Sequence, residues 1–327
     1  MPERRFRYVQ SVHAAGLSNP DDTTLHLLWQ IVDEGVLGAS NHVRLTQELL
    51  TYLLETGDDP GERWQRAALA AEFIADTRGR EAPVVGNTVR LLLQGLEQQP
   101  LEARLPQLAE RIHNWRRDAD RRLETLVARA VATLGAGRSI IAYDYSSTVA
   151  AVVVALCKAH PDTRVVVPES RAIAGGRRYL EAFLAAGIPV RLVLDAAFEQ
   201  VLEDSAVVLL GAESLRCDGS LTNTVGSLPL ARLARARGCP AYGCGDLLKL
   251  DLRSYEGYFA EPAVREFPHL LEGIDLPPGA VVDTRGPELE VVPPTLITAL
   301  LTDHGPVPPG ALWGLGREIF HMGGNAP

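Results

Sequence analysis

The hydrophobic pattern changes at Gly135, and this change constrains the fold more than any other feature of the sequence. Before it, apolar residues recur at helical spacing and strand signals are scarce. After it, short apolar runs such as VRLVL and AVVLLGA alternate with helical segments. Near-continuous apolar runs are typical of parallel strands buried on both faces. The sequence therefore predicts an α/β fold, with an α-helical domain over residues 1–134 followed by a Rossmann-like, doubly wound parallel-sheet domain over residues 135–327.

The periodicity and the turn residues also predict individual elements. In the first domain we expect a loop at 78–87 and helices at 23–36, 43–54, 62–77, 88–96 and 101–134. In the second domain we expect strands at 139–143, 163–167, 189–194, 206–211 and 240–245. The helices between them are predicted at 146–159, 173–186, 196–203 and 227–238. A proline-punctuated tail should add a strand or strand pair at 296–302 and a helix at 311–321.

Composition excludes several classes of protein. Hydrophobic residues make up 46% of the 327 residues and the net charge is −9, which indicates a globular protein without a general nucleic-acid-binding surface. No apolar run approaches the roughly 20 residues of a membrane span, and MPERRFRYVQS lacks the apolar core of a signal peptide. The four cysteines form no CxxC pair, and no GxGxxG follows the first strand. We therefore expect a cytoplasmic protein without a metal or a dinucleotide cofactor.

The turn YDYSSTVAAV joins the first predicted strand of the second domain to a helix. Asp144, Ser146 and Ser147 occupy this turn. The first N–H groups of a helix have no intrahelical partner, and the helix dipole favours negative charge there. One interpretation is a phosphate cradle beside a carboxylate. The alternative is that Ser146 or Ser147 only caps the helix.

Polar residues follow the carboxyl end of every predicted strand, where open α/β sheets bind their ligands. Arginines and helix termini bind phosphate, carboxylates bind hydroxyls, and one or two carboxylates can transfer protons. The set therefore suits a phosphorylated, polyhydroxylated ligand. Its members are Asp144, Ser146, Ser147, Glu169, Ser170, Arg171, Arg177, Asp195, Glu213, Asn223, Asp246 and Lys249.

Most of these residues also have a purely structural interpretation. Asp195 can be the N-cap of the helix that follows it. Glu169 and Arg171 can form a structural ion pair at the edge of the sheet. Asp246 and Lys249 can be solvated loop charges. The residues themselves leave these alternatives open.

Glu213 is the hardest to explain structurally, because it follows an apolar strand and Gly-Ala directly. A carboxylate that is partly buried there would have an altered proton affinity, as acid–base chemistry requires. His304 and His321 lie in the tail, and lone histidines are more often structural than catalytic.

Several segments, taken together, resemble one superfamily. They are PESRAIAGGRRYL, GIPVRLVLDAA, VVLLGAESLRCDGSLTNTVGS and LLKL, in this order, with TRGREAPVVGN before them and PPTLITALLTDHGPVPPGAL after them. The superfamily contains the alpha, beta and delta subunits of translation initiation factor 2B, methylthioribose-1-phosphate isomerase and ribose-1,5-bisphosphate isomerase. The resemblance implies a helical N-terminal domain, a Rossmann-like C-terminal domain, and a homodimer or higher homo-oligomer built through the latter.

The resemblance also implies roles for particular positions. The isomerases of this superfamily convert an aldose phosphate to a ketose with a cysteine after the first strand and an aspartate after the fourth. By position these fall on Asp144 and Glu213. Where the family has NKIGT this chain has NTVGS, from Asn223 to Ser227, so the lysine is missing. Two carboxylates in different environments can still divide acid and base roles, although aspartate does not match a thiolate as a nucleophile.

Two further positions complete the comparison. The family's glutamate before its final lysine falls on Asp246, and Lys249 matches that lysine. Near Gly38 the isomerases have an arginine-glycine motif for phosphate, and LGASNHVRL lacks that arginine.

Three functional hypotheses follow. In the first, the chain is an aldose–ketose isomerase, or a related enzyme, that acts on a phosphorylated pentose-type sugar. Its proton shuttles are Asp144 and Glu213, while the helix terminus at Ser146 and Ser147, together with the arginines, binds phosphate. In the second, it is a non-catalytic, initiation-factor-2B-like subunit that binds a sugar phosphate or a nucleotide. The third, a nucleic-acid-binding translation factor, is the weakest because the chain is acidic.

Overall fold

The computed structural model describes residues 20–32 and 39–320. The chain divides into two compact units, Met1–Arg121 and Arg122–Pro327. The boundary between them falls inside the long helix α7 (Leu101–Leu134). Among the described helices, none is both long enough and apolar enough to cross a membrane.

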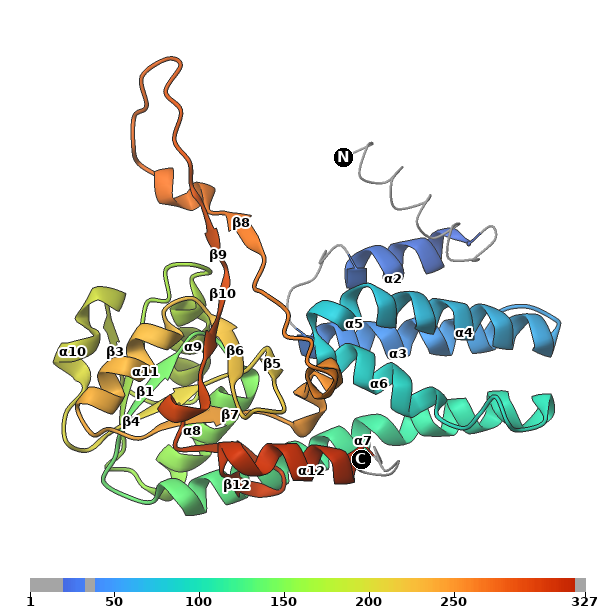
Figure 1. Cartoon of the computed structure of the whole chain (residues 1–327), viewed down its shortest axis with the longest axis horizontal. Helices are drawn as coiled ribbons and strands as arrows, with labels where there is room; N and C mark the ends of the chain where they lie inside the picture. The colour runs from blue at the N-terminus through green and yellow to red at the C-terminus, as the bar shows by residue number, and fades with distance from the viewer. Residues whose placement is uncertain (1–19, 33–38, 321–327) are drawn as a thin grey trace. The chain divides into compact units, whose positions relative to one another are not determined.

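The described part of the first unit is helical (Figure 1). The loop before α4 carries a clear start signal, because the Asp59 carboxylate accepts a hydrogen bond from the Glu62 N–H at 2.8 Å and Pro60 is the first helical residue. The helices predicted at 43–54 and 62–77 are present with shifted ends, and the helix predicted at 23–36 is present as far as Val32, while 33–36 lie outside the described residues. The helices before α7 are α2 (Asp22–Val32), α3 (Ala39–Glu55), α4 (Pro60–Asp76), α5 (Arg78–Glu81) and α6 (Pro83–Leu93).

The predicted loop at 78–87 is wrong, because this segment forms α5 and the first turns of α6. Its glycines signalled a break in the helical pattern, but they serve close packing. A Cβ atom built on Gly79 would lie 2.9 Å from the Cα of Gly86, so the two backbones touch there. Pro83 opens α6, where the N–H that proline lacks would have no intrahelical partner.

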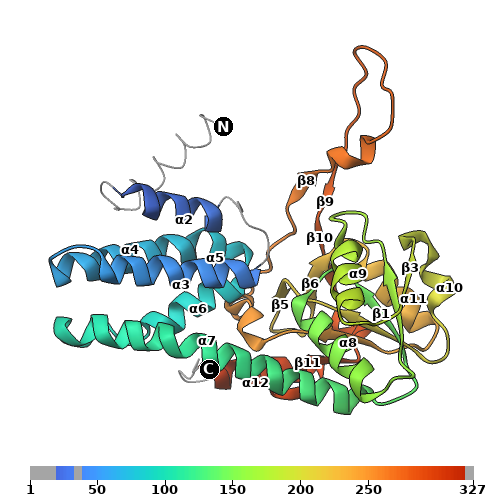
Figure 2. The same ribbon diagram turned by 180° about the vertical axis from the view of Figure 1, so that it is seen from behind.

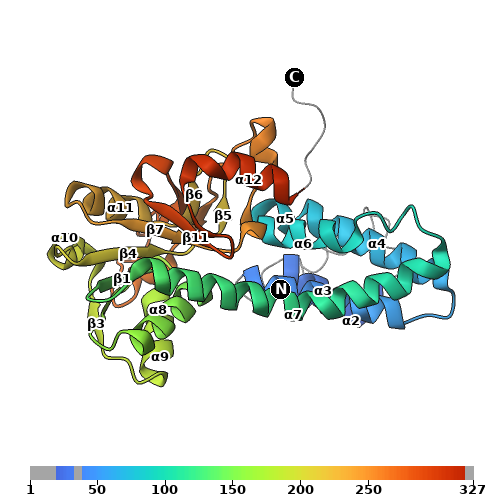
Figure 3. The same ribbon diagram turned by 90° about the horizontal axis from the view of Figure 1, so that it is seen from below.

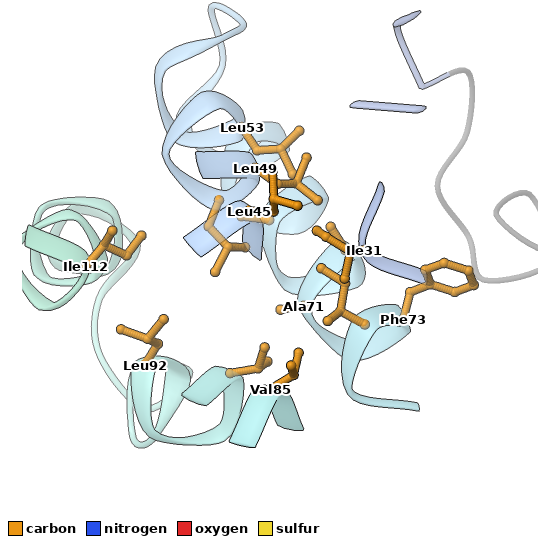
Figure 4. Close-up of a cluster of buried hydrophobic side chains, with 14 of the residues drawn as sticks. Ile31, Leu45, Leu49, Leu53, Ala71, Phe73, Val85, Leu92 and Ile112 are labelled. Atoms are coloured by element: carbon orange, nitrogen blue, oxygen red, sulfur yellow. The ribbon is translucent and has the colours of Figure 1, made fainter. Parts of the chain in front are cut away.

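The first unit has its own hydrophobic core (Figure 4). Leu45, Leu49 and Leu53 of α3 are spaced four residues apart and lie on one face of the helix, where each is at most 3% exposed. They pack with Val85 of α6 and Ile112 of α7 in one buried cluster.

The second unit is built on a mostly parallel sheet. In its described part, seven strands pair in the order β12-β11-β7-β4-β1-β2-β3. The edge pair β11–β12 is antiparallel and the other neighbours are parallel. When the six parallel strands are numbered 1 to 6 along the chain, their order across the sheet is 3-2-1-4-5-6. This is the doubly wound order, and its direction reverses between β1 and β4. The strands are β1 (Ser139–Tyr143), β2 (Arg164–Pro168), β3 (Val190–Val193), β4 (Ala206–Leu210), β7 (Ala241–Cys244), β11 (Ala299–Thr302) and β12 (Gly305–Val307).

Helices cover both faces of this sheet. The helices α8 (Ser147–Ala159) and α9 (Gly175–Ala185) lie over one face (Figure 2), together with the end of α7 (Figure 3). Because side chains alternate along a strand, Ile140 and Ala142 of β1 join that core, while Tyr143 points to the opposite face. There the Tyr143 ring meets Phe198 edge-on at 5.4 Å, in α10 (Phe198–Val201). The helix α11 (Ser227–Ala236) follows on that face and contacts β4 and β7.

Short strands outside the main sheet were not predicted. The first set, β5 (Ser214–Leu215), β6 (Leu221–Thr224) and β10 (Leu289–Val292), forms an antiparallel sheet in the order β10-β6-β5. The second, β8 (Val264–Glu266) and β9 (Arg285–Pro287), forms a ribbon that stands away from the main sheet of its unit (Figure 1). These segments have two to four residues each, too few for an alternating pattern to be visible.

In the tail, the range 296–302 predicted for a strand or strand pair contains one strand, β11, and its antiparallel partner β12 lies beyond that range. The described chain closes with α12 (Leu312–Ile319), within the helix predicted at 311–321. Single turns of 3₁₀ helix connect the remaining elements. They are η1 (Asp195–Ala197), η2 (Leu247–Lys249), η3 (Leu252–Glu256), η4 (Pro268–Leu271), η5 (Pro294–Leu296) and η6 (Pro309–Ala311). His321 and Gly38 lie outside the described residues.

Candidate functional site

The site lies beyond the carboxyl ends of β1 and β4, where the strand order reverses and where doubly wound sheets bind their ligands. Asp144 is the first residue after β1 and is 5% exposed. Its φ of 55° lies in the left-handed region, which aspartate and asparagine tolerate better than most residues. This backbone geometry turns the chain sharply from the strand into the loop before α8.

Two hydroxyl groups hold the Asp144 carboxyl. Ser170, in the loop after β2, donates from Oγ to Oδ1 at 2.9 Å. Thr224, at the end of β6, donates from Oγ1 to Oδ2 at 2.6 Å. Both partners are buried, at 0% and 3% exposure. Each carboxyl oxygen therefore has a fixed partner from a different part of the chain.

Burial raises the pKa of Asp144 above the usual aspartate range. The hydrogen bonds from Thr224, Ser170 and the Tyr145 N–H act in the opposite direction, and the nearby Glu213 carboxylate raises the pKa further. The net direction is upward, so Asp144 holds its proton to a higher pH than an exposed aspartate does. Glu213 follows β4 and is half-buried, so the second carboxyl group lies in a different environment from the buried Asp144.

The start of α9 presses against this carboxyl. A Cβ atom built on Gly175 would lie 2.3 Å from the Asp144 Oδ1 and 2.8 Å from the Tyr145 backbone nitrogen. Only glycine allows this approach. The PESRAIAGG segment thus shapes the surroundings of Asp144, because it provides both Ser170 and the glycine that makes room for the carboxyl.

At the start of α8, Ser146 caps the helix, because its Oγ accepts from the Val149 N–H at 3.4 Å. Its own N–H donates to the Tyr179 hydroxyl at 3.1 Å. Ser147 is exposed. Because Ser147 and Thr148 begin the helix, their N–H groups have no intrahelical acceptor. The cap therefore leaves two amide donors at the helix terminus, and phosphate binding there remains a prediction.

Asp195 binds backbone amides. Its Oδ1 and Oδ2 accept from the N–H groups of Ser170 and Arg171, both at 2.9 Å. Leu194, not Asp195, is the N-cap of η1, and no side-chain capping bond forms, so the N-cap alternative is wrong. Asp195 thus fixes the turn that presents Ser170 to Asp144.

The charged side chains near this turn are less enclosed. Arg171 and Arg177 are exposed, and Glu169 is half-buried. Within the described part of the chain, Glu169 and Arg171 form no ion pair with each other, which contradicts the structural pair considered for them. The Nε2 of His269 lies 3.0 Å from the Arg171 carbonyl oxygen.

Asp246 and Lys249 are not solvated loop charges, and that alternative is wrong. The Oδ2 of Asp246 accepts from the Arg122 Nε at 2.8 Å, and its Oδ1 caps η2 by accepting from the Leu248 N–H. Lys249 donates from Nζ to the carbonyl oxygen of Ala212, the residue before Glu213. Lys249 is therefore held beside the loop that carries Glu213, whereas the Asp246 carboxylate is engaged elsewhere.

The small antiparallel sheet supplies Asn223, which the sequence predicted, and also Thr224 and Glu290, which it did not. Besides Thr224, β6 carries Asn223, which is 6% exposed and donates from Nδ2 to the Ser227 Oγ at 3.0 Å. From β10, the Oε1 of Glu290 accepts from the Gly226 N–H at 2.6 Å and thereby caps α11. The sequence feature that could have indicated Thr224 is the threonine in NTVGS, which stands where the family that this chain resembles has a lysine.

The described residues contain no cluster of three or more histidine, cysteine, aspartate or glutamate side chains suited to a metal ion. The four cysteines are free. Burial raises the pKa of the Cys244 thiol to about 12, which makes it a poor nucleophile near neutral pH.

A helical segment followed by a doubly wound unit defines an α/β protein, and its two carboxyl groups lie at the switch point of the sheet, where proteins of this architecture bind their ligands. The chain belongs to the initiation factor 2 subunit family, whose sequence model matches residues 43–309.

The relatives of this chain include both enzymes and translation factors. It is 26% identical over 299 residues to the ribose 1,5-bisphosphate isomerase of Haloterrigena turkmenica, covering 87% of this chain and 90% of the relative. It is 28% identical over 194 residues to the eIF2B alpha subunit of Caenorhabditis elegans, covering 56% and 58%. Among solved structures, the translation initiation factor eIF-2B of Pyrococcus horikoshii OT3 has a similar fold, with a TM-score of 0.73 at 20% identity, covering 89% and 98%.

Proposed function

We propose that this protein is an aldose–ketose isomerase, or a closely related enzyme, that acts on a phosphorylated pentose-type sugar. The observation that supports this most is the pair of carboxyl groups at the switch point. Asp144 is buried with a raised pKa, and Glu213 is close enough to contribute to that shift. Two neighbouring carboxyl groups in different environments are the arrangement by which enzymes divide acid and base roles.

The chemistry requires one acid and one base. Converting an aldose to a ketose removes a proton from the carbon next to the carbonyl, returns a proton to the former carbonyl carbon and moves a hydroxyl proton. In our proposal Glu213, which is half-buried, takes the carbon-bound proton. Asp144, which holds its proton to a higher pH, donates to the carbonyl oxygen. Lys249, held at the Ala212 carbonyl, positions the Glu213 loop.

Phosphate binding fits the same site. The amides of Ser147 and Thr148 start α8 without an intrahelical acceptor, and the helix dipole favours an anion there. Arg171 and Arg177 are exposed and available to a ligand phosphate. A protonated Asp144 adds no negative charge beside the phosphate, whereas an ionised carboxylate would repel it.

The experiment is a turnover assay by NMR with pentose phosphates and methylthioribose phosphate. Asp144→Asn and Glu213→Gln should each reduce turnover by about 100-fold or more, as expected for the loss of an acid or a base. Asp283→Asn is the matched control, because this exposed carboxylate lies in the loop before β9 and pairs with Arg285, the first residue of β9. If both site variants turned over an accepted sugar phosphate at the wild-type rate, the proposed function would be wrong.

A second candidate is a non-catalytic subunit that binds a sugar phosphate or a nucleotide, as the initiation-factor relatives suggest. The observation in its favour is that both oxygens of Asp144 already have protein partners. Under this candidate, a sugar phosphate or nucleotide raises the melting temperature and no isomer exchange occurs. Detectable exchange for any sugar phosphate of the panel contradicts it. A homodimer in the cytoplasm remains part of either proposal, and sedimentation analysis tests the oligomer.

A further inference from the structure

The partners of Asp144 have a property that other polar side chains lack. A hydroxyl group can donate one hydrogen bond and accept others, and its proton rotates freely about the C–O bond. Ser170 Oγ and Thr224 Oγ1 lie 2.9 Å and 2.6 Å from the two oxygens of the carboxyl. Both hydroxyls can donate to an ionised carboxylate. When the carboxyl is protonated, one of them can instead accept its proton.

The groups that face Asp144 do not favour its charged form strongly. Glu213 is a second carboxylate, and the buried Tyr143 and Tyr179 carry neutral hydroxyls with raised pKa values. Within the described residues, no cationic side chain forms an ion pair with Asp144. With 5% exposure, the carboxyl also has little access to water that could replace a lost partner.

We propose that Thr224 and Ser170 are positioning residues whose hydroxyls hold the Asp144 carboxyl in place in both its protonated and its ionised form. When the carboxyl transfers its proton to a ligand oxygen, the hydroxyl that had accepted it rotates to donate. No buried oxygen is then left without a partner at either stage, and the carboxyl keeps its orientation. This inference deepens the proposed isomerase function and rests on it for its catalytic meaning.

A lysine at position 224 would have the opposite effect. An ammonium group only donates hydrogen bonds, and its positive charge next to Oδ2 would keep Asp144 ionised. Such a carboxylate could not act as the acid. The proposal therefore requires a hydroxyl group at position 224, and a side chain that only fills the same volume would not suffice.

The test is a pH titration of the full chain with ¹³C-labelled aspartate carboxyl groups, in which the Asp144 signal is identified by its loss in Asp144→Asn. Thr224→Val should raise the titration midpoint by about one pH unit, because one donor to the ionised form is lost. Ser170→Ala should raise it similarly. Thr224→Ser keeps the hydroxyl and should retain the wild-type midpoint. Circular dichroism verifies that each variant is folded.

The matched control is Thr222→Val, the same substitution two residues earlier on β6. The Thr222 Oγ1 is buried and has no hydrogen-bond partner among the described residues, so this variant should leave the Asp144 midpoint unchanged. Equal midpoints in wild type, Thr224→Val and Ser170→Ala would overturn the proposal. A Thr224→Ser midpoint that matches Thr224→Val rather than wild type would also overturn it.

The titration needs no substrate, so the positioning role of the hydroxyls and the isomerase function can be tested separately. Shifted midpoints with no turnover in the sugar-phosphate panel support the hydroxyl positioning and contradict the isomerase function. Turnover with unshifted midpoints contradicts the positioning alone. If the protein is an isomerase and the midpoints also shift, the part of the kcat–pH profile that falls with rising pH should move to higher pH in Thr224→Val. The shift should equal that of the NMR midpoint.

Discussion

Asp144→Asn should stabilise the second unit at neutral pH, and the structure indicates how the gain depends on pH. The amide has nearly the same shape as the carboxyl, and asparagine tolerates the φ of 55° at this position. Its oxygen can accept from one hydroxyl and its NH₂ can donate to the other, so Ser170 and Thr224 both keep a partner. The substitution therefore carries little steric or hydrogen-bonding penalty.

The sign follows from proton linkage. Burial raises the pKa of Asp144 in the folded state above its unfolded value, which is about 3.9. The stability that the protonated carboxyl contributes is fully present below that unfolded value and is lost as the pH rises through the folded pKa. Asparagine is neutral throughout. The variant should thus match wild type near pH 3 and exceed it at higher pH by about 1.4 kcal/mol for each unit by which the pKa is raised.

The assay is urea denaturation at several pH values, with hydrogen exchange in β1 and β4 as the readout, so that the second unit is measured directly. Asp195→Asn is a matched control with the opposite expected sign. Both oxygens of Asp195 accept from backbone N–H groups, and an NH₂ group cannot accept, so this variant should lose about 1–3 kcal/mol. A stability difference between Asp144→Asn and wild type that does not change with pH would contradict a raised pKa of Asp144 in the folded state.

Three further outcomes test the surroundings of the site. Glu213→Gln removes the negative charge that raises the pKa of Asp144, so the ¹³C midpoint of Asp144 should move to lower pH. Gly226→Ala should lower the free energy of unfolding by about 2–5 kcal/mol in urea denaturation, because φ is 105° and the new Cβ would lie 1.9 Å from the Tyr143 hydroxyl oxygen. Tyr143→Phe in the same chain should recover part of that loss. Thr222→Val replaces an unpaired buried hydroxyl and should raise stability by about 1 kcal/mol in thermal denaturation.

The sequence predicted the main sheet because its signals are local. The runs that became β1 and β4 are buried along their whole length, and such runs are visible without any knowledge of their neighbours. The hydroxyl cap at Ser146 is equally local. Because the predicted sheet is parallel, Asp144 and Glu213 were also expected at the same edge, beyond the carboxyl ends of their strands, and Glu213 is near enough to raise the pKa of Asp144.

The partners of Asp144 could not be predicted in this way. Thr224 is 80 positions further along the chain and lies on a four-residue strand whose sequence, LTNT, has no apolar alternation. That strand is fixed by β10, which pairs Val291 with Thr222 across a long, proline-rich segment. Contacts at such separation depend on the assembled fold and leave no periodic trace in the sequence.

The contact between Asp144 and Thr224 changes how the departures from the isomerase pattern are understood. The resemblance puts a cysteine at one of these positions and a lysine at the other, and each change by itself suggests lost activity. In the structure the two replacements are hydrogen-bonded to each other at 2.6 Å. Loss of catalysis does not require that the residue facing a new carboxyl be a hydroxyl. A site that transfers a proton through Asp144 does require a hydroxyl at position 224, because a lysine at that position would keep the Asp144 carboxyl ionised. Under the proposed isomerase function, we infer that the pair is one joint change that keeps a proton donor at the switch point, and not two independent losses.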